Sequence, residues 1–81
     1  MRLVYDRMAC GGWFQCVQKW DDFEMNLPEG KADLRESQDR GDGTFVREVP
    51  DAAVEKAKAA AESCPAEAIF LYDDDGEQIV P

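Results

Sequence analysis

The residues best suited to chemistry in this sequence are three cysteines, Cys10, Cys16 and Cys64. None of the 81 residues is a histidine, so the commonest general base and the commonest nitrogen ligand of zinc are both missing. The reactive side chains that remain are thiols and carboxylates. An odd number of cysteines suits a disulfide framework poorly and suits metal ligation in a reducing compartment better. The cysteines are therefore the first candidates for a functional site.

The spacing of these cysteines narrows the chemistry. Five residues separate Cys10 from Cys16, and Cys64 is followed directly by Pro65. Iron–sulfur proteins use cysteines two residues apart, followed by a distant Cys-Pro, because such short steps let successive thiolates reach separate irons of one cluster. Such a run without its middle cysteine has the spacing found here, with Trp13 in the middle position. An indole cannot bind iron, so the spacing indicates three thiolate ligands.

Three other interpretations of the cysteines stay open. Free cysteines are often buried as small apolar residues, with no further role. A disulfide could join Cys10 to Cys16 and leave Cys64 free. A zinc ion is the weakest alternative, because three cysteines without a histidine leave a structural site one ligand short unless a carboxylate joins them.

Length and charge exclude several classes of protein. A chain of 81 residues allows one domain, residues 1–81, and a domain of this size gains little stability from its core, so a metal or other staple is expected. Acidic residues outnumber basic ones by 18 to 9, which gives a net charge of −9 and argues against nucleic acid or an anionic membrane as partner. The apolar runs are short and no signal peptide is apparent at the N-terminus, so we expect a cytoplasmic protein.

The elements that must position the cysteines follow from the hydrophobic pattern. The sequence predicts strands over residues 3–5, 23–27, 44–49, 68–72 and 78–80, and helices over residues 16–22 and 52–63. The strand over 44–49 is expected to close a hairpin with 23–27. Between them, residues 28–43 are predicted to be an irregular excursion with a short ordered piece near 32–35. This order predicts an α+β, ferredoxin-like fold: a duplicated βαβ unit with small antiparallel sheets, two helices and a C-terminal strand extension.

With these motifs in place, nearly the whole sequence resembles a single-cluster bacterial or archaeal ferredoxin of the 3Fe-4S kind. The resemblance is carried by the first strand, the C-x5-C pair, the strand over 23–27, and the segment over 59–69 that contains Cys64-Pro65. The sequence departs from the family in the length of the excursion over 28–43 and in the bulk of residues 12–14.

The resemblance implies a role for each residue of the loop. Cys10, Cys16 and Cys64 would each bind one iron, and Trp13 would cover the corner that lacks an iron. The backbone N–H groups of the intervening residues would face the sulfides of the cluster; these residues are Gly11, Gly12, Trp13, Phe14 and Gln15. A 4Fe-4S cluster with a fourth ligand from outside the protein is the alternative cofactor.

The implied function is one-electron transfer between a reductase and an acceptor such as a cytochrome P450, by a monomer that is not an enzyme. Partners with basic docking faces would suit the acidic surface, and Asp21, Asp22 and Glu24, close to Cys16, are the expected docking edge. The acidity is equally typical of a protein from a halophile. Two other functions stay open: a ferredoxin-fold interaction or regulatory domain without a cluster, and a thiol–disulfide redox module using Cys10 and Cys16.

Overall fold

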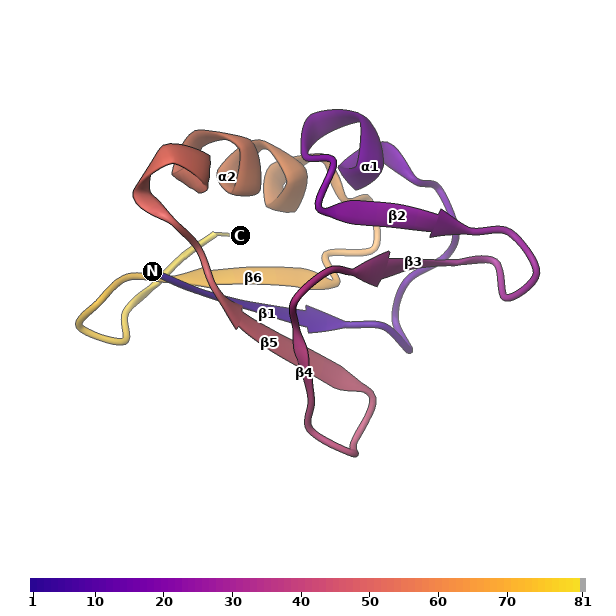
Figure 1. Ribbon diagram of the computed structural model, residues 1–81, viewed down its shortest axis with the longest axis horizontal. Helices are drawn as coiled ribbons and strands as arrows, with labels where there is room; N and C mark the ends of the chain where they lie inside the picture. The colour runs from indigo at the N-terminus through magenta and orange to yellow at the C-terminus, as the bar shows by residue number, and fades with distance from the viewer. Residues whose placement is uncertain (81) are drawn as a thin grey trace.

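The computed structural model describes residues 1–80, in which two helices lie on one face of an antiparallel sheet and a separate hairpin projects beside them (Figure 1). The elements are, in chain order, β1 (Arg2–Asp6), α1 (Gln15–Lys19), β2 (Phe23–Asn26), β3 (Lys31–Leu34), β4 (Gln38–Asp39), β5 (Thr44–Glu48), a 3-10 turn (Asp51–Ala53), α2 (Val54–Ser63), β6 (Ile69–Tyr72) and β7 (Gln78–Val80). No helix within residues 1–80 has the length and hydropathy of a membrane-spanning segment.

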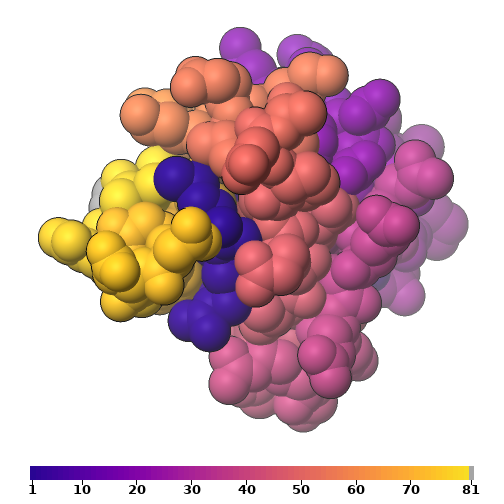
Figure 2. All heavy atoms as spheres, turned by 60° about the vertical axis from the view of Figure 1, so that its left-hand side comes forward, coloured from indigo at the N-terminus to yellow at the C-terminus, as the bar shows by residue number. Residues whose placement is uncertain are grey.

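Strand β1 occupies the centre of a five-stranded sheet with the order β4-β5-β1-β6-β7. It pairs antiparallel with β5 on one side and with β6 on the other. Figure 2 shows this from one end of the molecule, with the N-terminal residues in indigo between the yellow C-terminal strands and the segments of β5 and α2. Alternate residues of the central strands are fully buried, as expected of a sheet with one face covered: Leu3, Tyr5, Ile69 and Leu71. The predicted α+β, ferredoxin-like class is therefore confirmed.

Helix α2 covers the sheet with a face made of alanines. Ala57, Ala60 and Ala61 are buried, and their small side chains let the helix pack close to the strands beneath it. The helix ends at Ser63 because Cys64 takes an extended conformation (φ −74°, ψ 112°), the conformation that a following proline favours. The shorter helix α1 packs directly against α2.

The hairpin predicted from residues 23–27 and 44–49 is wrong. Strand β2 pairs with β3, in a register that sets Phe23 opposite Leu34 and Asn26 opposite Lys31, whereas β5 pairs with β1 and β4. A tight turn closes the β2–β3 hairpin, because the Gly30 N–H donates to the Asn26 carbonyl at 2.9 Å and Gly30 adopts φ +67°. Alternating apolar residues show that a strand has a buried face, but they do not identify its partner.

The excursion over residues 28–43 is also more regular than predicted. Its first half contains β3, at the place where a short ordered piece is expected, and its second half contains β4. Strand β4 pairs with the outer edge of β5, with Gln38 opposite Val46. A glycine-rich turn then leads into β5, and the Arg40 N–H donates to the Thr44 carbonyl at 3.0 Å. The excursion thus adds one edge strand to the sheet.

A buried arginine connects the sheet to the segment after α1. The guanidinium of Arg47 on β5 donates to Asp22 Oδ2 at 2.7 Å and to the Arg35 carbonyl at 3.0 Å, and it lies 4.7 Å from the centre of the Trp20 ring. The Arg47 side chain is only 5% exposed. Because this contact occupies Asp22, the expected docking edge retains Asp21 and Glu24 as exposed carboxylates.

Replacing Arg47 with methionine is expected to destabilise the protein. The change leaves the Asp22 carboxylate and the Arg35 carbonyl without their shared donor. Breaking a fully buried ion pair costs about 3–5 kcal/mol, and the partly exposed Asp22 reduces this to about 2 kcal/mol. Urea unfolding measures the loss. The exposed Arg40→Met variant is the control and should stay within about 0.5 kcal/mol of the wild type; equal stability of the two variants would show that the Arg47 contact is not structural.

Candidate functional site

The three cysteines lie on three different segments at one end of the helical layer. Cys10 lies in the loop between β1 and α1, Cys16 lies in the first turn of α1, and Cys64 follows the last residue of α2. All three are free thiols. Cys16 is 6% exposed, whereas Cys10 and Cys64 are half-buried. The packing of α1 against α2 brings the second and third of these segments together.

Cys16 lies close enough to both Cys10 and Cys64 for their charges to affect the pKa of its thiol. Burial, together with the charges that Cys10 and Cys64 would carry as thiolates, raises the pKa of the Cys16 thiol to about 11. The helix that carries it begins abruptly, because Phe14 takes a left-handed conformation (φ 60°) directly before α1. That conformation turns the chain so that Cys16 faces the core.

Cys10 differs because the chain around it favours the thiolate. Burial by itself raises the pKa of the Cys10 thiol, but hydrogen bonds from the backbone N–H groups of Ala32 and Gly12, together with the nearby Tyr5 hydroxyl and the charge of Lys31, lower the pKa overall. Two of these groups, Ala32 and Lys31, belong to β3 rather than to the loop. Neither residue could be identified from the sequence, because no pattern in the sequence places β3 against the cysteine loop.

Cys64 lies in a tight turn that ends α2. The Glu67 N–H donates to the Cys64 carbonyl at 3.1 Å, and Pro65 supplies the fixed φ that suits the second position of such a turn. Glu67 takes φ +52° and directs the chain into β6. The half-buried Cys64 also lines a surface hollow of about 290 Å³, together with Ala61, Glu62, Glu67, Ile79 and Val80.

Each of the two adjacent glycines of the loop lies in close contact with another group. A Cβ at Gly11 would come within 1.8 Å of the Trp13 ring, which folds back over the loop, and a Cβ at Gly12 would come within 2.5 Å of the Gly30 carbonyl oxygen. Gly12 also has φ +79°. The Trp13 side chain is 57% exposed, so its indole lies over Gly11 at the surface.

The β2–β3 hairpin holds the cysteine loop through a series of polar contacts. The buried Tyr5 hydroxyl donates to the Ala32 carbonyl at 2.8 Å. Arg7, at the start of the loop, bonds to Asp33 at 3.0 Å and forms an ion pair with Glu29. Together with the contact of Gly12 on the hairpin turn, these bonds fix the loop against the hairpin along its length.

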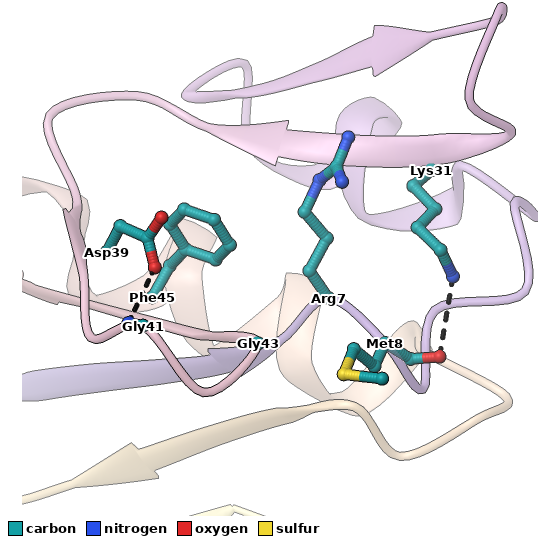
Figure 3. A pocket seen from close by; sticks show the side chains of 7 residues that line it. All are labelled: Arg7, Met8, Lys31, Asp39, Gly41, Gly43 and Phe45. Carbon is teal, nitrogen blue, oxygen red and sulfur yellow. Dashed lines mark hydrogen bonds between the residues drawn. The ribbon is translucent and has the colours of Figure 1, made fainter.

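A cavity of about 240 Å³ lies behind this contact, between the loop and the turn that leads into β5 (Figure 3). Seven residues line it: Arg7, Met8, Lys31, Asp39, Gly41, Gly43 and Phe45. The polar groups in its wall bond to other protein groups, since Asp39 accepts from the Gly41 N–H and Arg7 bonds to the hairpin carboxylates. We therefore assign no ligand to the cavity.

The donor set fits an iron–sulfur cluster better than a single ion. Within residues 1–80 no three cysteine or carboxylate side chains converge where one metal ion would bind. The thiolates of a cluster lie farther apart than the ligands of a single ion, because each thiolate binds a different iron. The N–H groups of Gly11, Trp13 and Phe14 donate to no backbone carbonyl among the described residues. Such backbone N–H groups beside the thiols can donate hydrogen bonds to the sulfides of a cluster.

A strand–helix plan repeated around cysteine-bearing segments defines the ferredoxin class of electron-transfer domains. Comparison with known families agrees: the family described as the 4Fe-4S single cluster domain matches residues 3–71, and the chain belongs to this family. It is a small, single-cluster ferredoxin domain with an iron–sulfur cofactor, and membership of this family suggests an electron carrier. No curated protein and no solved structure matches the chain.

Replacing Gly12 with alanine is expected to destabilise the protein more than the same change at Gly76. Both glycines have positive φ, but a Cβ at Gly76 meets nothing within 4 Å. Gly76→Ala should therefore cost only the left-handed conformation, about 1–2 kcal/mol. Gly12→Ala adds the clash with the hairpin, about 1–3 kcal/mol more. Unfolding in urea compares the two, and equal losses would mean that the hairpin moves away from the loop freely.

Proposed function

We propose that this protein carries single electrons on a 3Fe-4S cluster bound by Cys10, Cys16 and Cys64. The observation that carries the proposal is that the chain belongs to a single-cluster family and has only these three cysteines, on segments that pack at one end of the fold. When bound, the cluster supplies a reversible one-electron couple. The protein supplies the ligands, the surrounding hydrogen-bond donors and the exclusion of water.

The number of thiols favours three irons. The middle position of the C-x5-C run holds Trp13, and no other cysteine exists to replace it. The alternative is a 4Fe-4S cluster, the type named in the family description, with a fourth ligand from outside the protein. The exposed indole of Trp13 lies over Gly11, in the loop between two of the three thiols.

The loop is suited to stabilise the sulfides. The free N–H groups of Gly11, Trp13 and Phe14 are available as donors, and Gly12 lets the loop approach the hairpin closely. Metal binding at such a site contributes to folding free energy, because the site does not exist in the unfolded chain. The cluster would therefore also supply the additional stabilising cross-link that so short a chain needs.

A thiol–disulfide module is the less well supported function. A redox-active pair needs one thiol with a lowered pKa and a partner that it can reach. Here the pKa of Cys10 is lowered, but Cys16, with a pKa of about 11, is a poor thiolate, and the two thiols form no disulfide. A cluster-free interaction domain would lack iron altogether.

The acidic surface supports partners with basic docking faces, namely a reductase and an acceptor cytochrome or other redox enzyme. The net charge is −9, and Glu24, whose side chain is 62% exposed, lies on β2 close to the α1 segment that carries Cys16. Opposite charges raise the rate of encounter more than the affinity. We also propose that the protein is a monomer in the cytoplasm. We propose a halophile as its source, since an acidic surface with few lysines is typical of proteins adapted to high salt.

The protein purified without oxygen is expected to be brown and to contain about three irons per chain. An oxidised 3Fe-4S cluster has an odd number of unpaired spins and gives an EPR signal, whereas an oxidised 4Fe-4S cluster gives none. Iron analysis and EPR spectroscopy of the oxidised protein are the measurements. Cys64→Ala, which removes one thiol, should lose the iron. A colourless wild-type protein without iron would contradict the proposal.

Replacing Trp13 with cysteine is expected to convert the cluster to the 4Fe-4S type. The new thiol occupies the position at which a four-cysteine run has its second ligand. After reconstitution the EPR signal of the oxidised protein should disappear and the iron content should rise by about one per chain. Gln18→Cys, at an exposed position of α1, is the control that adds a thiol outside the loop. An unchanged EPR signal in Trp13→Cys would show that position 13 does not face the cluster.

A further inference from the structure

Lys31 joins the cysteine loop to the β2–β3 hairpin. It is the first residue of β3, and its ammonium donates to the Cys10 carbonyl at 2.8 Å and to the Met8 carbonyl at 3.4 Å. Figure 3 shows the side chain extending from the hairpin to the Met8 carbonyl, beside Arg7. Lys31 is half-buried, and no other side chain within residues 1–80 bonds to the Cys10 carbonyl.

The charge of Lys31 is not neutralised by a carboxylate. Within the described part of the chain, no Asp or Glu oxygen lies at ion-pair distance from its ammonium. The hairpin carboxylates closest along the chain, Glu29 and Asp33, pair with Arg7 instead. The positive charge of Lys31 therefore faces the backbone of the loop on which Cys10 lies, in a region where the field of a charge is less screened than in water.

We propose that Lys31 is a positioning residue with two effects on the site: its bonds to the carbonyls of Met8 and Cys10 fasten the cysteine loop to the hairpin, and its charge raises the reduction potential of the bound cluster. The proposal rests on the proposed function for its second effect.

The direction of the effect follows from the charge balance. Reduction adds one electron to the cluster and leaves it more negative. A fixed positive charge close by stabilises the reduced form more than the oxidised form, so it raises the potential. Removing the charge of Lys31 must therefore lower the reduction potential. The charge of Arg7 does not substitute, because that guanidinium is paired with both Glu29 and Asp33.

The first test compares reduction potentials of purified, iron-containing variants. Lys31→Gln is expected to shift the ratio of reduced to oxidised cluster about tenfold toward the oxidised form at a fixed potential, which is about 59 mV for one electron. Lys31→Arg keeps the charge and should restore most of the potential. Lys56→Gln, on the exposed side of α2, makes the same change in net charge and is the control. Equal potentials of Lys31→Gln and Lys56→Gln would overturn the electrostatic effect.

The second test asks whether Lys31 holds the loop against the hairpin. It measures the hydrogen-exchange rates of the backbone amides over residues 8–13 in each protein as purified. Lys31→Gln is expected to exchange at least tenfold faster over this segment than Lys56→Gln, because the loop opens more often. Equal exchange would overturn the fastening effect. If the wild type contains no iron, the proposed function and the effect on potential both fail, and the exchange rates alone decide whether Lys31 holds the loop.

Discussion

The contact between the cysteine loop and the β2–β3 hairpin is the constraint on which the site depends. The loop has few backbone bonds of its own, since only its first turn is closed by the Ala9 and Cys10 N–H groups. Its shape comes from the hairpin, through the contact of Gly12 on the Gly30 carbonyl and the bonds to Lys31. Because the glycine has no Cβ, the two backbones can meet directly, and a loop without regular structure gains a rigid support.

The support is in turn tied to the centre of the sheet. Tyr5 is buried on β1, packs its ring edge-on against Phe23 at 5.4 Å between centroids, and gives its hydroxyl proton to the Ala32 carbonyl of β3. One residue of the central strand therefore contacts both strands of the hairpin. Every buried side-chain nitrogen or oxygen within residues 1–80 has a hydrogen-bond partner, so these contacts leave no uncompensated polar group in the core.

The sequence contained most of what was needed to predict the fold class and the thiol set. The alanine-rich run ending at Cys64-Pro65 predicted α2 within two residues at its start and correctly at its end, because composition and the proline act locally. Strand pairing could not be predicted in this way. The alternation over 23–27 fits either neighbour, and the choice of β3 depends on a turn at Gly30 and on burial of Ala32 and Leu34.

The supporting residues of the site were unpredictable for a related reason. Lys31 and Arg47 are charged residues whose partners are 21 and 25 positions away in the chain, at Cys10 and Asp22. Charged residues are usually solvated, so their types alone give no signal of burial or of a contact. Spacing rules identify residues that act through the local chain, such as C-x5-C. They do not identify groups that arrive from another element.

The central place of β1 has a consequence for the order of folding. Strand β1 pairs with residues 44–48 on one side and 69–72 on the other, all of which follow it in the chain. It can complete neither ladder until most of the chain has followed, whereas the β2–β3 hairpin and α2 close locally. During synthesis β1 has both edges unpaired, and the cysteine loop precedes the hairpin that supports it. We therefore expect the local hairpin and α2 to form before the two ladders of β1.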